Sequence, residues 1–86
     1  MKTTLMLLAQ YDGRAAVPVE DVCRDYFAPL TLPVFLRKLG CGEIPLPVTR
    51  MTDSQKGPKM IHIEDLAAYI DRQRESAKRE LAAMRS

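Results

Sequence analysis

The chain has 86 residues, 47% of them hydrophobic and 28% charged, and its 13 basic and 11 acidic side chains give a net charge of +2. These values are typical of one small folded domain and exclude a disordered chain. No apolar run approaches the ~20 residues that a membrane span requires, and the run 5–9 is shorter than the ~7–15 residues of a secretion-signal core. We therefore expect a cytoplasmic protein without a membrane segment.

Cysteine and histidine are too few for a metal centre. Cys23 and Cys41 have no C-x-x-C spacing, and His62 is the only histidine. We expect two free thiols in a reducing compartment, and one disulfide in a secreted chain is the alternative. There is also no glycine-rich phosphate loop, and Glu64 and Asp65 beside His62 are explained by a helix start. We expect no catalytic residue, metal or cofactor.

The positive charge is concentrated in the middle of the chain. Residues 31–60 carry five basic and two acidic side chains, a net charge of +3, whereas residues 61–86 are balanced. A local excess of this kind sets the field that a polyanion meets, so it is more informative than the total.

Two short helices are expected ahead of this basic segment. Residues 3–11 predict a short helix with Thr3 or Thr4 as its cap and Gly13 after its end, with a buried strand as the alternative. Residues 18–27 predict an amphipathic helix, with Pro18 in its first turn and Pro29 as its stop. Its apolar side consists of Val19, Val22, Cys23, Tyr26 and Phe27.

A third helix is expected over residues 32–39, with Thr31 as its N-cap and the glycines at 40 and 42 at its end. Its apolar side has Leu32, Phe35, Leu36 and Leu39, and its other side has Pro33, Val34, Arg37 and Lys38. Together with the helix before it, it predicts a helix-turn-helix.

The segment "IPLPVTR", residues 44–50, alternates apolar and polar positions and predicts a strand. Pro45 and Pro47 remove two N–H donors from the same edge, so this strand can pair only on its other side. The predicted partner is residues 59–63, with Ile61 and Ile63 facing the core. The result is a β-hairpin whose tip is basic.

The last element is a long helix from Glu64 to the end, with acids in its first turn. Leu66 is followed at helical spacing by Ile70, Gln73, Ala77, Leu81 and Met84. The helix is too long for so small a domain to cover, so its second half is expected to project and to bind a partner. Residues 70, 73, 77, 81 and 84 are the predicted oligomerisation surface of residues 64–86, and residues 1–63 are the predicted DNA-binding domain.

A DNA-binding function would explain the helix-turn-helix, the basic hairpin and the local positive charge together. In a winged helix-turn-helix the second helix reads the major groove, and the hairpin after it is the wing. Arg37 and Lys38 would contact guanine or phosphate, Val34 a thymine methyl, and Thr31 a phosphate. The wing, residues 50–59, would contact phosphates or the minor groove through Arg50, Ser54, Gln55, Lys56 and Lys59.

Several segments also resemble a known family. "LLAQYDGRAAVPVEDVCRDYF", "FLRK", "GEIPLPVTR", "SQK" and "IEDLAAYIDRQRESAKREL" are similar to the pyocin activator protein PrtN family, over about residues 5–81. The resemblance implies a small activator that binds promoter DNA and switches on bacteriocin or prophage-type genes. Arg37, Lys38, Arg50, Ser54, Gln55 and Lys56 are the motif positions that carry across.

The fold class predicted is therefore mainly α with a small β-hairpin, a winged helix-turn-helix of the excisionase or MerR type with a long C-terminal helix. The expected partners are double-stranded DNA, a second copy or higher oligomer, and RNA polymerase, although no sequence feature identifies a polymerase-contacting surface. Two alternatives remain: an excisionase-like factor that only bends DNA, and a helical adaptor that binds a protein and never DNA.

Overall fold

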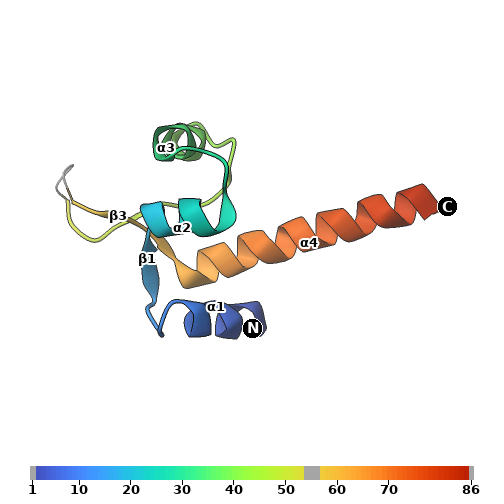
Figure 1. Ribbon diagram of the computed structural model, residues 1–86, viewed down its shortest axis with the longest axis horizontal. Coiled ribbons are helices and arrows are strands. Elements are labelled where there is room, and N and C mark those ends of the chain that lie inside the picture. The colour runs from blue at the N-terminus through green and yellow to red at the C-terminus, as the bar shows by residue number, and fades with distance from the viewer. Residues whose placement is uncertain (1, 54–56, 86) are drawn as a thin grey trace.

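The computed structural model describes residues 2–53 and 57–85, and within them it is mainly helical with a small antiparallel sheet (Figure 1). The helices are α1 (Lys2–Gln10), α2 (Val19–Tyr26), α3 (Leu32–Gly40) and α4 (Ile63–Arg85). The strands are β1 (Ala16–Pro18), β2 (Thr49–Arg50) and β3 (Lys59–His62). No helix in this part of the chain is both long and apolar enough to cross a membrane.

The sheet has the strand order β1-β3-β2, so β3 is its central strand. The predicted pairing of the two hairpin strands is confirmed, with Thr49 opposite Met60 and Arg50 opposite Lys59. The sequence did not predict β1, which pairs with the other edge of β3 through Val17 and Ile61. Pro18 ends this strand and stands at the N-cap of α2, so its predicted place inside the helix was wrong.

The predicted strand over residues 44–50 is reduced to Thr49 and Arg50. Ile44 and Leu46 do face the core, as the alternation indicated. The segment is not paired as a strand, because its remaining N–H groups bond locally: Ile44 N–H donates to the Lys38 carbonyl oxygen at 3.2 Å and Leu46 N–H to the Ile44 carbonyl oxygen at 2.8 Å. Pro45 and Pro47 have no N–H to donate. Arg72 of α4 instead donates from Nη2 to the carbonyl oxygen of Pro45, at 3.3 Å, and so holds this segment against α4.

The core lies between the sheet and the helices. The largest fully buried side chains are Phe35, Ile61, Ile63, Leu66, Val17, Val19 and Val22. Phe35 of α3 packs against Phe27 with ring centroids 4.6 Å apart, and Phe27 packs against Tyr69 of α4 at 5.7 Å. Burial confirms the predicted apolar side of residues 32–39 and, for Val19, Val22 and Cys23, that of residues 18–27. Tyr26, also placed on that side, is 39% exposed. The ring contacts connect α3 through the end of α2 to α4.

The N-terminal segment is a helix, and the alternative of a buried strand is excluded. Gly13 has a φ of +76°, and its N–H donates to the Leu8 carbonyl at 2.7 Å, which closes the end of α1 as predicted. The threonine caps were wrong, because α1 already begins at Lys2. Thr3 instead donates from its hydroxyl to Asp71 of α4, at 2.6 Å.

The other helix starts differ in their caps. Thr31 stands at the N-cap of α3, but its side chain makes no capping hydrogen bond, contrary to the expectation. At the start of α4, His62 accepts the Glu64 N–H at its Nδ1, at 3.0 Å, and so satisfies one of the free N–H groups of the first turn. α4 begins at Ile63, one residue before the predicted start.

A hydrogen bond of Tyr11 predicts how stability depends on pH. The buried Tyr11 donates from its hydroxyl to Asp25 of α2, at 2.7 Å. Burial, and then this hydrogen bond, raise the pKa of Tyr11 far above its ordinary value near 10. The raised pKa contributes stability that is complete below about pH 10 and is lost as the pH rises through the folded-state pKa.

We expect Tyr11→Phe to lower the free energy of unfolding by about 1 kcal/mol near neutral pH and to reduce its decline above about pH 10. Burial also raises the pKa of Tyr26, so part of the decline should remain. Urea unfolding across this pH range measures both effects. An unchanged decline in Tyr11→Phe would show that Tyr11 does not cause it.

Candidate nucleic-acid interface

The outward side of α3 carries the first of the predicted DNA-contacting residues. Arg37 is exposed, and Val34, one turn before it, is half-buried. Thr31 is exposed at the start of the helix. Phe35 and Leu39 are buried on the opposite side and fix which side of α3 faces solvent. The polar and apolar sides of this helix are therefore as the periodicity predicted.

Lys38 has a partner that the sequence did not indicate. Its Nζ forms an ion pair with the carboxylate of Glu43. The chain turns back between them with Gly42 at a φ of +81°, a conformation that glycine adopts without strain. The hydrogen bond and the charge of Lys38 lower the pKa of Glu43 below its ordinary value, with a smaller effect from Arg37. In the sequence, only the glycine between these two opposite charges could have indicated this ion pair.

The hairpin brings two further basic residues together. Arg50 of β2 is directly opposite Lys59 of β3 in the register. Side chains opposite each other in an antiparallel pair lie on the same face, about 5 Å apart at their Cβ atoms, and like charges there are destabilising. The fold thus places two positive charges side by side at the end of the sheet.

The register also shows which face these two residues occupy. Lys59 and Ile61 are two positions apart in β3, so their side chains are on the same face of the strand. Ile61 is fully buried in the core that the helices cover. Arg50 and Lys59 therefore project beyond the core on the core-facing side of the sheet. α3 packs on α2, and Figure 1 shows it apart from the strands, on the far side of α2.

Some basic residues of the described chain are paired and others are not. Arg14 and Arg24 pair with carboxylates of α2, Lys38 pairs with Glu43, and Lys78 pairs with Glu75. Within residues 2–53 and 57–85, no ion pair joins Arg37, Arg50 or Lys59 to a carboxylate, and the same holds for Lys2 and for the other basic residues of α4. We define Arg37, Arg50 and Lys59 as the basic face, because they come from the segment with the excess of positive charge. The predicted contacts Ser54, Gln55 and Lys56 lie outside the described residues.

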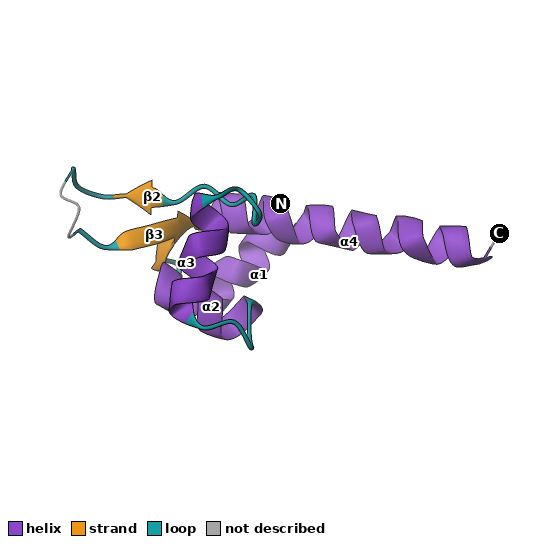
Figure 2. Ribbon diagram, turned by 90° about the horizontal axis from the view of Figure 1, so that it is seen from above, coloured by secondary structure: helices purple, strands orange, loops and turns teal. Residues whose placement is uncertain are grey.

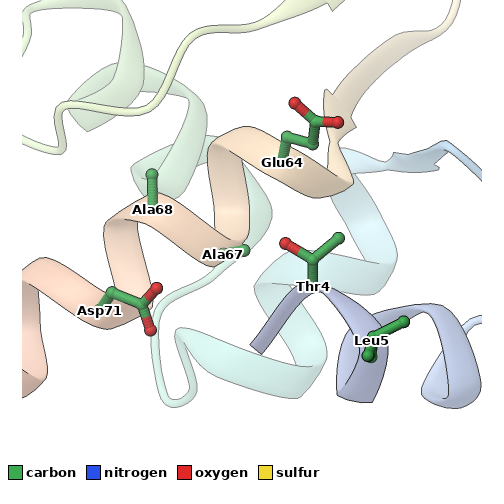
Figure 3. Close-up of a pocket in the computed structure, with 6 residues that line it drawn as sticks. All are labelled: Thr4, Leu5, Glu64, Ala67, Ala68 and Asp71. Carbon is green, nitrogen blue, oxygen red and sulfur yellow. The ribbon is translucent and has the colours of Figure 1, made fainter. Parts of the chain in front are cut away.

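A second surface, a groove between α1 and α4, has the opposite charge. It has a volume of about 470 Å³ and is lined by Thr4, Leu5, Glu64, Ala67, Ala68 and Asp71. Figure 3 shows Thr4 and Ala67 pointing toward one another, with the carboxylates of Glu64 and Asp71 at either end. Two carboxylates repel a polyanion, so this groove does not extend the basic face.

Metal chemistry has no support in the described part of the chain, where no three His, Cys, Asp or Glu side chains gather as a metal site would require. Cys23 is buried and Cys41 is exposed, and both are free thiols. Cys23 packs in the core and directs its Sγ toward the Leu30 carbonyl oxygen, at 3.4 Å.

The fold and the basic face define a small, mainly helical protein with a three-stranded antiparallel sheet, in which a positively charged hairpin follows α3 along the chain. A family model described as "Pyocin activator protein PrtN" matches residues 3–77. The chain therefore belongs to the pyocin activator protein PrtN family, as its sequence motifs indicated. This is a regulatory family, and it points to a role in activating transcription. No curated protein and no solved structure gave a match.

The Lys38–Glu43 pair predicts a measurable change in a carboxyl pKa. Lys38→Ala removes the main cause of the lowered pKa, so the pKa of Glu43 should rise toward its ordinary value. An NMR pH titration of the Glu43 side chain measures this. Arg50→Ala is the control and should leave that pKa unchanged. The pairing would be contradicted if Lys38→Ala left it unchanged too.

Proposed function

We propose that this protein is a winged helix-turn-helix transcriptional activator that binds double-stranded DNA of bacteriocin or prophage-type genes. In this proposal α2 and α3 form the helix-turn-helix, and β2 and β3 form the wing. The order of elements supports it, because a hairpin follows directly after the second helix of the motif. The regulatory family to which the chain belongs supports it as well.

The observation that carries the proposal is the basic face. Arg50 and Lys59 are opposite each other without a carboxylate partner among the described residues, an arrangement that costs stability. A phosphate backbone along the hairpin would offset this repulsion and release its own counterions. Arg37 on the exposed side of α3 would contact base edges, for which guanine O6 and N7 are the commonest partners of arginine.

The other predicted contact residues differ in how free their side chains are to bind DNA. Lys38 is paired with Glu43, so a phosphate would have to compete with that carboxylate. Thr31 uses no side-chain oxygen to cap α3, which leaves its hydroxyl for a phosphate. Val34 is half-buried and would offer only part of its side chain to a thymine methyl. We propose that DNA binding occurs in the cytoplasm, on the nucleoid, as a homodimer or higher oligomer that also contacts RNA polymerase.

Fluorescence anisotropy with duplex DNA from upstream of the gene tests this function, at several salt concentrations and against a scrambled duplex. Arg37→Ala should weaken binding to the upstream duplex by about 1–3 kcal/mol and reduce the preference over the scrambled one. Arg50→Ala and Lys59→Ala should weaken binding to both duplexes. Each should also make the negative slope of log K for DNA association against log salt concentration shallower by about 1.

Arg79→Ala, in the exposed part of α4, is the matched control for loss of one arginine. It should bind both duplexes as the wild type does. The proposal would be overturned if the wild type bound neither duplex, or if Arg79→Ala reduced affinity as much as Arg50→Ala.

A further inference from the structure

The outer half of α4 carries an apolar surface that the body of the protein does not cover. α4 has 23 residues, and Figure 2 shows its C-terminal half clear of the other elements. Leu81 is 50% exposed and Met84 is 77% exposed. Apolar side chains at helical spacing on an exposed helix are typical of a surface that packs against another helix.

This surface is symmetric about one residue. Ile70, Gln73, Ala77, Leu81 and Met84 follow one another at steps of three, four, four and three residues. At about 100° per residue, all of them lie within about 40° of Ala77 around the helix. A second copy running in the opposite direction, with a two-fold axis at Ala77, would place Ile70 level with Met84 and Gln73 level with Leu81.

We propose that two copies of this chain pair through α4 in antiparallel orientation, with the two-fold axis at Ala77. The small Ala77 side chains allow close approach of the helices at the axis. Since the contact is isologous, the Ile70–Met84 and Gln73–Leu81 layers each occur twice, and the Ala77 layer on the axis occurs once. The paired segment, residues 70–84, is about 21 Å long at 1.5 Å per residue.

The body of the protein favours the antiparallel direction. Tyr26 and Phe27 of the α2 end lie beside the inner end of the apolar surface, where they line a depression of about 360 Å³ together with Leu66, Tyr69, Ile70 and Gln73. In an antiparallel pair, Met84 of the second copy reaches Ile70 and enters this depression. In a parallel pair, the globular body of the second copy would lie beside this depression instead. Both Met84 side chains would then lie at the opposite end of the pair, away from either depression.

Charges beside the apolar surface are of mixed sign. An antiparallel two-fold axis brings the same flank of each helix together. Asp71 and Arg85 are on one flank, and Asp71 lies two positions from the level of Arg85 of the second copy. This opposite-sign pair occurs twice. Arg74 and Lys78 oppose each other on the same flank, where solvent screens their repulsion.

One consequence rests on the proposed function. Leu66, where α4 leaves the core, is roughly 17 Å along the helix from Ala77, so the two Leu66 residues of the pair are about 33 Å apart along α4. The hairpin extends from the body away from the C-terminus (Figure 2), so Arg50 and Lys59 of the two copies lie farther apart than this. The dimer would therefore contact two separated stretches of DNA.

Disulfide crosslinking of the full chain without DNA tests the pairing alone. In a Cys41→Ser background, Gln73→Cys, Ala77→Cys and Leu81→Cys are made, each with and without a size tag, and oxidised singly and in mixtures. Ala77→Cys should crosslink to itself. The mixture of Gln73→Cys with Leu81→Cys should give the mixed dimer as its main product. Gln73→Cys alone should give almost none, because its copies are about 12 Å apart along the helix and disulfide Cβ atoms must approach to ~3.8 Å.

Strong self-crosslinking of Gln73→Cys or Leu81→Cys would overturn the antiparallel direction, and failure of Ala77→Cys to crosslink would overturn the pairing. Sedimentation velocity adds a second readout: Leu81→Glu should be monomeric, and Ala82→Glu, on the other side of α4, should remain dimeric. Circular dichroism confirms that each variant is folded. A wild type that is monomeric at all concentrations would overturn the proposal, and none of these outcomes depends on DNA binding.

Discussion

The position of α3 depends on the burial of Phe35. This side chain is fully buried, and its ring packs on Phe27, which in turn packs on Tyr69 of α4. Aromatic pairs at such distances add to the stability that burial of their apolar area provides. Because the exposed Arg37 follows Phe35 by two positions on a short helix, fixing Phe35 also fixes the direction in which Arg37 points. The proposed contact with DNA therefore depends on a core contact.

The same body holds the other half of the basic face. β3 lies at the centre of the sheet, with β1 on one edge and β2 on the other, and the fully buried Ile61 sets the face on which Lys59 projects. β2 is only two residues long, and the proline-containing segment before it is held by Arg72 of α4. The hairpin and α3 are thus positioned by one core, and α4 connects that core to the proposed dimer surface.

The sequence predicted most of the helices because their apolar periodicity is strong, as in α2 and α4. It did not predict β1, because three residues are too short to show alternation and Pro18 equally suits a helix start. It overestimated β2, because alternation records which side is buried and not which backbone groups are paired. The sides of α3 were predictable from Phe35 and Leu39, but the Lys38–Glu43 pair depends on a turn whose direction local pattern does not specify.

The most direct test of a DNA-binding surface built from α3 and the hairpin is an NMR titration of the isotope-labelled protein with its upstream duplex. The largest chemical-shift changes are expected at Arg37, Arg50, Lys59 and their neighbours, with little change in α1 or in the acidic groove beside Glu64. Changes confined to α1 or to the outer half of α4, or no change at all with duplex DNA, would contradict this assignment of the surface.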